Sequence, residues 1–267
     1  MRFPLFPAAM VAAALLAGCG AEAPATPAAG PPSPTPTATP GPEHEGPAVL
    51  GAVRGAAAGL GALQSAEETA HARVQLGLCD MPAPLVGNYR DPVSVRSFFT
   101  IRAQTKPAAY RGGGQRGEAI GKVRVVAVDR PDATPPPVEQ AFDAMRGTTC
   151  TGGATHLLGE PHSGVIGYRG ASGTVRVAGA TGVLATATAD TEDLDAGGYY
   201  PLLGHARVIV RHGGYLIETT VLCARPARPR EQRAVTAEAR TRAVALAERV
   251  VRNLDALPPA PTPAPAG

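Results

Sequence analysis

Two β-branched segments separated by a glycine pair constrain the fold of this chain more than any other feature. The stretch HARVIVRHGGYLIETTVLC, residues 205–223, carries alternating side chains on both sides of Gly213-Gly214. A two-residue glycine connection supplies the positive φ angles that a tight β-hairpin needs. The chain is therefore expected to contain an antiparallel β-sheet, in which residues 205–223 form two adjacent strands.

The first strand of this hairpin carries a row of polar side chains. His205, Arg207 and Arg211 follow a two-residue period and so fall on one face of the strand. We name these three as candidate ligand-facing residues, because a basic row suits an acidic ligand. The alternative is that they form the solvated side of a half-buried sheet.

Hydrophobic periodicity elsewhere predicts further strands and helices. Further strands are expected at 70–78, 93–104 and 122–130, and in the short runs SGVIGYRG, GTVRVAG and GVLATATAD. Helices are expected at 138–149 and 234–257, each with an apolar stripe, and more weakly within the glycine-containing segment 47–68. The sequence thus predicts an α+β fold: an antiparallel β-sheet of about six to eight strands with helices packed on one face, in a single domain.

The first residues have the order of an export signal. Residues 1–18, MRFPLFPAAMVAAALLAG, comprise a basic residue, a short apolar run and small residues. That run is shorter than the ~20 apolar residues of a transmembrane helix. The sequence LAGC that ends at Cys19 resembles the lipobox of bacterial lipoproteins, in which the cysteine is acylated and the signal is cleaved before it. The resemblance implies lipidation of Cys19 and a lipid anchor on the outer face of the cytoplasmic membrane. The alternative is an ordinary secretory signal.

Segments rich in proline flank the predicted domain. Residues 19–47 are dominated by Pro, Ala and Thr and predict a disordered tether that begins at the lipidated cysteine. Residues 258–267 have a similar composition and predict a disordered tail. The folded α+β domain is accordingly expected at 48–257.

The net charge is small, and the placement of the basic residues argues against one class of partner. The formal net charge is +3, and the basic residues are scattered without interleaved aromatic residues, so no nucleic-acid partner is expected. Arginine supplies nearly all of the basic residues, since Lys106 and Lys122 are the only lysines. This bias is typical of a GC-rich coding sequence and fits an actinobacterial source.

Three cysteines follow Cys19. Cys79, Cys150 and Cys223 would meet oxidising conditions in an exported protein, where disulfides are common, and one of the three must stay unpaired. A catalytic thiol at the unpaired cysteine is the alternative to a structural one. Cys79 lies in LGLCDMP, without a nearby histidine or cation, which favours a buried or unpaired structural thiol there over a catalytic one.

The order of elements between residues 120 and 257 resembles a known group of proteins. VVAVD in a strand, a helix before Cys150, the glycine hairpin and the final helix with AVALAERVVRNL follow one another. This order is similar to actinobacterial lipoproteins that resemble the extracellular sensor-like domain of mycobacterial Ser/Thr kinases. The resemblance implies a Cys150–Cys223 disulfide, an extracytoplasmic ligand and no enzymatic activity. The tryptophan usual in that group is absent.

Patterns that would indicate catalysis or metal binding are incomplete. GGGQRGEAIGK, residues 112–122, lacks the glycine and hydroxyl residue of a phosphate-binding loop. His156, Glu160 and His162 are interrupted by Pro161, and the acidic run 190–198 lacks the spacing of a calcium loop. Ser163 lacks the glycine that precedes a hydrolase nucleophile. No catalytic residue, metal site or cofactor is therefore predicted.

These sequence features together predict a surface-anchored lipoprotein with a non-catalytic binding or sensing domain. Its expected partners are the lipid bilayer, through Cys19, and an unidentified small molecule, wall component or envelope protein. An envelope-directed hydrolase and an assembly factor for another envelope protein are the alternatives. A cleft with a few convergent polar groups would favour binding or catalysis, whereas a flat exposed apolar patch would favour assembly.

Overall fold

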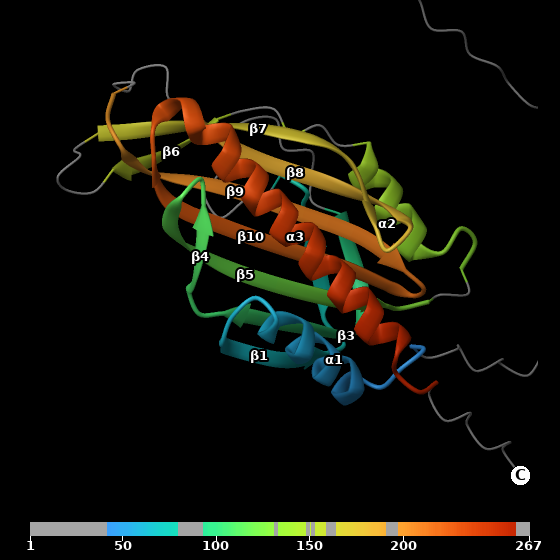
Figure 1. Ribbon diagram of the computed structural model, residues 1–267. Helices are drawn as coiled ribbons and strands as arrows, with labels where there is room; N and C mark the ends of the chain where they lie inside the picture. Colours follow the sequence, from blue (N-terminus) through green and yellow to red (C-terminus); the bar gives the residue numbers. More distant parts are fainter. Residues whose placement is uncertain are drawn as a thin grey trace, which may run out of the picture. The chain divides into compact units, whose positions relative to one another are not determined.

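The β-sheet dominates the computed structural model, in which ten strands pair antiparallel (Figure 1). The structure describes residues 42–79, 93–130, 133–147, 150, 153–158, 164–190 and 197–259; the side chains of 153–158, 164–168 and 190 are outside this description. The described residues belong to one compact unit. The predicted signal, Cys19, most of the tether and the tail lie outside the described residues, as do Glu160, His162 and Ser163.

Strand order follows β1-β3-β5-β10-β9-β8-β7-β6, while β2 pairs with β3 and β4 pairs with β5. The strands are β1 (Leu63–Ala70), β2 (Arg73–Leu76), β3 (Val93–Thr105), β4 (Ala108–Gly112), β5 (Gln115–Val128), β6 (Gly153–Leu158), β7 (Gly164–Val177), β8 (Ala180–Asp190), β9 (Tyr200–His212) and β10 (Tyr215–Ala227). β9 and β10 form the predicted hairpin, and Gly213 in its turn has a φ of +53°, which favours glycine. The predicted α+β class with an antiparallel sheet is confirmed.

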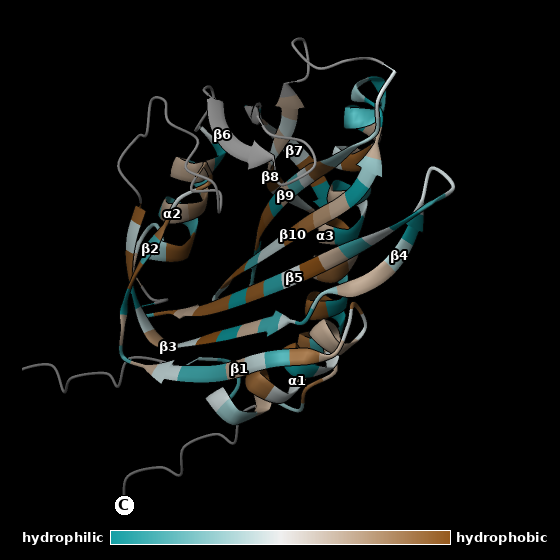
Figure 2. Cartoon of the chain, turned by 90° about the vertical axis from the view of Figure 1, so that its left-hand side faces the viewer, coloured by the Kyte–Doolittle hydropathy of each residue, from teal (hydrophilic) through white to brown (hydrophobic). Residues whose placement is uncertain are grey.

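The helices lie on both faces of the sheet (Figure 2). α1 (Gly46–Ala58) and α3 (Gln232–Asp255) share one face, and the Thr219 hydroxyl of β10 donates to the Ala243 carbonyl of α3 at 2.8 Å. α2 (Pro137–Arg146) lies on the other face, where its Glu139 forms an ion pair with Arg211 of β9. The prediction that helices share one face therefore holds for α1 and α3 but not for α2.

The core between α3 and the sheet is built from small and β-branched residues. α3 buries the stripe Val235, Ala239, Ala243, Leu246, Ala247, Val250 and Leu254. Close contact is possible because β9 has a glycine beneath the start of α3: a Cβ at Gly204 would lie 2.3 Å from the Val235 carbonyl oxygen. Burial of each Val or Leu side chain contributes about 1.5 to 3 kcal/mol to the stability of the fold. Several such residues therefore build this part of the core without any tryptophan.

The described ends of the chain meet at the tip of the β9–β10 hairpin. The backbone N–H of His44, just before α1, donates to the Tyr215 hydroxyl at 3.0 Å. On the other side of the turn, His212 Nε2 lies 2.8 Å from a carboxylate oxygen of Asp255, the last residue of α3. The segment before α1 and the end of α3 are thus fixed to the same end of the sheet.

The disulfide joins Cys79 to Cys150, with a Cα–Cα distance of 5.3 Å, and Cys223 is a free, fully buried cysteine. The prediction of a Cys150–Cys223 bond and of an unpaired Cys79 is wrong. Cys223 shares a face of β10 with Thr219, which contacts α3, whereas Cys150 follows α2 on the opposite face. The sheet itself therefore separates Cys150 from Cys223.

Candidate functional site

A polar cavity of about 370 Å³ lies on the face of the sheet opposite α3. Four strands of its wall, β1, β3, β5 and β10, are consecutive in the sheet, and β9 completes it. We call this cavity the sheet-face pocket. Its charged lining residues are Glu67, Arg102, Lys122, Arg124, Arg207 and Glu218.

Strand register explains why these residues converge. Glu67, Arg102, Arg124 and Glu218 stand directly opposite one another across β1, β3, β5 and β10. Because cross-strand partners point to the same face, these four strands place one continuous charged row in the pocket.

A second row lies two residues further along the same face. It runs through Ser65, Gln104, Lys122, Thr220 and Arg207, in order across β1, β3, β5, β10 and β9. Alternation with period two brings all of these side chains to one side of the sheet. The pocket is therefore a direct product of register in the middle of the sheet.

The floor of the pocket is a buried triad of two arginines and one carboxylate. Arg124 Nε donates to Glu218 Oε2 at 2.8 Å, and Arg207 Nε lies 3.2 Å from Glu218 Oε1 in an ionic contact without hydrogen-bond geometry. The side chains of Arg207 and Glu218 are only 9% and 10% exposed. The Arg207 guanidinium also donates to the Gly77 carbonyl, and the Arg124 guanidinium donates to the Gln75 carbonyl. Both bonds hold the segment around β2 against the sheet.

Arg102 and Lys122 differ from the triad because both are exposed at the rim of the pocket. Among the described residues, neither side chain forms a hydrogen bond or an ion pair. Glu67, also exposed, stands opposite Arg102 without an ion pair to it. The rim thus presents two cations that no described carboxylate neutralises by direct contact.

The three residues predicted to face a ligand have separate environments. Arg207 lies in the pocket, within the triad. Arg211 lies outside it, in the ion pair with Glu139 of α2. His205 is opposite Leu222, one row beyond Arg207 on the same face, and is 5% exposed. The sequence therefore identified one residue of the pocket and one of its neighbours.

The environment of His205 keeps its imidazole neutral. Neither ring nitrogen has a hydrogen-bond partner among the described residues. Burial, followed by the positive charges of Arg207 and Lys122, lowers the pKa of His205 to about 3. In the unfolded chain the same group takes up a proton near its ordinary pKa of 6.5.

We expect His205 to make the fold less stable in acid. Because only the unfolded chain takes up this proton, the free energy of unfolding keeps its full value above about pH 6.5. It falls progressively as the pH drops toward 3, by at most ~1.4 kcal/mol per pH unit. His205→Leu should remove this dependence and be at least as stable as the wild type at pH 7, because no hydrogen bond is lost. Urea denaturation from pH 7 to pH 4 measures it, with exposed His71→Asn as the control that keeps the wild-type slope. An unchanged slope in His205→Leu would contradict this account.

The free cysteine lies in a second polar cluster, beneath α3 on the other face of the sheet. The Tyr110 hydroxyl donates to Glu238 at 2.8 Å, and Arg225 Nε lies 3.1 Å from the same carboxylate. Arg242 covers the Tyr110 ring at 4.3 Å from its centroid. Burial raises the pKa of the Cys223 thiol to about 11. This disfavours the thiolate form that a catalytic cysteine requires.

The remaining candidate motifs carry no site within the described part of the chain. GGGQRGEAIGK spans the turn between β4 and β5, where Gly113 and Gly114 have positive φ angles. No group of His, Cys, Asp and Glu suited to a metal ion occurs among the residues described. In the same residues, no helix is both long and apolar enough to cross a membrane. Residues 191–196 of the acidic run and the side chain of His156 are outside the description.

Most pocket residues were missed at the level of sequence, although a signal exists for some. Lys122 and Arg124 alternate with Val123 and Val125, a pattern that places two cations on one face of β5. Glu67 was not predicted to face a site because its segment was expected to be helical. Finding the pocket requires the pairing of β5 with β3 and β10, which no single segment encodes.

Comparison with known proteins identifies no family. No family model matches the chain, and no curated protein matches it. Among solved structures, the extracellular domain of PknH from Mycobacterium tuberculosis is similar over 78% of this chain and 94% of that domain, with 10% identity and a TM-score of 0.35. The fold resembles that extracellular domain distantly, and the likeness concerns the fold alone.

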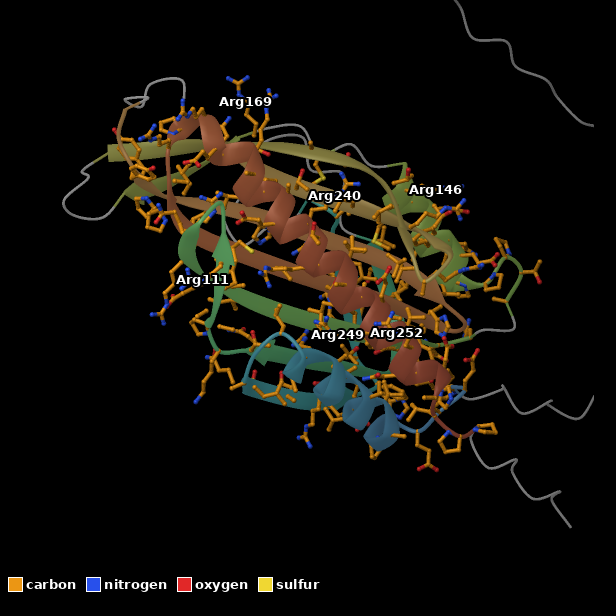
Figure 3. All side chains as sticks on the ribbon, in the orientation of Figure 1. Arg111, Arg146, Arg169, Arg240, Arg249 and Arg252 are labelled. Carbon is orange, nitrogen blue, oxygen red and sulfur yellow. A yellow bond between two sulfur atoms is a disulfide. The ribbon has the colours of Figure 1, made fainter. Side chains whose placement is uncertain are left out.

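Figure 3 shows the α3 side of the molecule, where Arg240, Arg249 and Arg252 project from α3; the sheet-face pocket is on the other side.

Proposed function

We propose that this chain is a lipid-anchored extracytoplasmic binding protein whose ligand occupies the sheet-face pocket. The observation that carries the proposal is the convergence of six charged side chains, from five strands, on one cavity of about 370 Å³. Pockets with a few convergent polar groups on a rigid scaffold are typical of ligand sites. The extended sheet around the pocket supplies that scaffold.

Binding is favoured over catalysis by the chemistry of the lining. Glu218 is occupied by two guanidinium groups and is not free to act as a base. The hydroxyls of Ser65 and Thr220 have no histidine or carboxylate within hydrogen-bond distance among the described residues. A nucleophile needs such an activating partner, and so we assign the pocket a non-catalytic role.

An extracytoplasmic location is supported by two independent features. The Cys79–Cys150 disulfide is typical of exported proteins, because the cytoplasm keeps thiols reduced. The sequence up to Cys19 resembles a lipoprotein signal, and acylation there would hold the protein at the outer face of the membrane. Cys19→Ala should leave the chain unlipidated and with residues 1–18 uncleaved, whereas the wild type should lose residues 1–18 and gain acyl chains, as intact mass measures. A wild-type chain without added acyl mass would contradict the anchor.

The binding role is tested by filling the pocket without changing its charge. Ser65 lines the pocket from the edge strand β1, and Thr69 lies on the same strand beyond the pocket. We expect compounds that stabilise the wild-type chain to fail with Ser65→Trp and to act normally on Thr69→Trp. At a ligand concentration 100 times the dissociation constant, binding contributes ~2.7 kcal/mol, which corresponds to roughly 5 to 10 °C in melting temperature for a chain of this size.

The measurement is thermal denaturation of the full chain with anionic, cationic and neutral small molecules in separate groups. A shift that survives Ser65→Trp would place the ligand elsewhere. A complete absence of stabilising compounds in all three groups would contradict the proposed function.

A further inference from the structure

We propose that the sheet-face pocket recognises a phosphate-type dianion, held mainly by Arg102 and Lys122. This inference rests on the proposed function and specifies the ligand class of that site. The shared chemistry is a compact group with two negative charges and several acceptor oxygens, whether it belongs to a small soluble ester or to a lipid headgroup.

The first argument is the charge balance of the pocket. Four cations and two carboxylates line it. One carboxylate, Glu218, is shared by Arg124 and Arg207 in the floor. The cations at the rim, Arg102 and Lys122, have no ion-pair partner among the described residues. An excess of two positive charges remains, and a dianion would neutralise it.

The second argument is the repulsion between arginines on adjacent strands. Arg102 of β3 stands directly opposite Arg124 of β5, and Lys122 follows on the same face of β5. Like charges directly opposite one another destabilise a sheet. The pair Arg111 and Arg116 has the same register in the β4–β5 hairpin, but both of those side chains are exposed, so that water screens them. The Arg124 side chain is only 21% exposed and is screened less.

The third argument is the supply of neutral hydrogen-bond donors. The hydroxyls of Ser65 and Thr220 line the pocket, and among the described residues neither forms a hydrogen bond. Both lie in the row that contains Lys122. Phosphate oxygens accept hydrogen bonds from hydroxyl, guanidinium and ammonium groups alike, and charged donors give the strongest of these.

The size of the pocket sets the extent of the ligand. A cavity of about 370 Å³ is larger than an inorganic phosphate ion, so the dianion is expected to be part of a larger molecule. Glu67 at the rim offers a carboxylate that can accept hydrogen bonds from hydroxyl groups of such a ligand. The dianion itself is the part that the lining specifies most strongly.

The test uses the full chain and inorganic phosphate as the probe. We expect phosphate to raise the melting temperature saturably, beyond the effect of sodium chloride at matched ionic strength. Arg102→Gln and Lys122→Gln should each weaken phosphate binding by about 10- to 100-fold, the range for one charge-assisted hydrogen bond. Arg111→Gln is the matched control, because it removes an arginine (labelled in Figure 3) from an equivalent cross-strand pair, neither member of which lines the pocket, and it should bind phosphate normally.

Stability without phosphate separates a ligand contact from a structural one. Arg102→Gln should melt at the same temperature as the wild type or higher in phosphate-free buffer, because the substitution relieves repulsion with Arg124. A lower melting temperature would indicate a structural role for Arg102 and overturn the inference. Equal effects of phosphate and chloride would overturn it as well.

A second arm distinguishes the sources of the dianion. Full chain carrying Cys19→Ala, which lacks the acylated cysteine, is sedimented with vesicles of phosphatidic acid, whose phosphomonoester headgroup can carry two negative charges, and with phosphatidylcholine vesicles. Binding to phosphatidic acid that is lost in Arg102→Gln supports a lipid headgroup, whereas a phosphate response without vesicle binding supports a soluble ester. If neutral compounds bind in a manner sensitive to Ser65→Trp while phosphate has no effect, the proposed function holds and this inference fails.

Discussion

Replacing Glu218 with glutamine is expected to lower the free energy of unfolding by about 3 to 5 kcal/mol, the range for removing one partner of a buried ion pair. Glu218 contacts Arg124 and Arg207, and the side chains of Glu218 and Arg207 are at least nine-tenths buried. Without the carboxylate, two guanidinium groups would face each other in a poorly hydrated site. Urea denaturation of Glu218→Gln and wild type at pH 7 gives the difference.

The control for this measurement is an ion pair with the same residue types at the surface. Glu139 and Arg211 are each 42% exposed, so Glu139→Gln should cost no more than about 1 kcal/mol. The combined substitution of Arg124 and Arg207 by Met and of Glu218 by Leu should recover much of the stability lost in Glu218→Gln, because no buried charge remains. If Glu218→Gln costs as little as Glu139→Gln, the triad is hydrated and the description of the pocket floor is wrong.

The second large effect is expected from the disulfide. Cys79 and Cys150 close a loop with a sequence separation of 71 residues. In the chain-entropy treatment, opening a loop of this length lowers the free energy of unfolding by about 4 kcal/mol. Cys79→Ser should show this loss in urea denaturation under non-reducing conditions, and wild type with reductant should show a similar loss.

Reductant distinguishes the disulfide from other consequences of the substitution. Cys79→Ser should be insensitive to reductant, since Cys223 is buried and unpaired on the other face of the sheet. Cys223→Ala provides the control: it keeps the disulfide and should respond to reductant as the wild type does. Intact mass after alkylation without reductant should show that Cys79 and Cys150 are protected in wild type. Labelling of Cys79 under those conditions would contradict the assignment.

The elements that sequence predicted best are those whose local pattern agrees with the final packing. The hairpin around Gly213 and the final helix carry their own turn and stripe signals, and both form where expected. Residues 63–70 show the opposite case. Their sequence LQSAEETA is rich in helix-forming residues, yet it becomes β1 because β3 offers a paired edge, with Glu67 opposite Arg102. Tertiary pairing there overrides local propensity.

The disulfide and the pocket could not be predicted for a common reason. Both depend on which side of the sheet a residue occupies after the strands have paired. Cys150 and Cys223 are compatible by composition, but the sheet lies between them. Arg102, Arg124 and Glu218 come from three separate strands and meet only through register. Sequence periodicity gives the side of one strand, whereas a site requires the relative alignment of several.

The attachment of both described chain ends to one hairpin tip has a mechanical consequence. His44 is held by Tyr215, and Asp255 by His212, so a pull between the two ends would load this corner and pass little tension through the central strands. A protein anchored to a surface through the segment before α1 would then be attached at that corner. The distal corner, with β4 and the start of β9, would lie farthest from the point of attachment, and the strands that line the sheet-face pocket would carry little of the load.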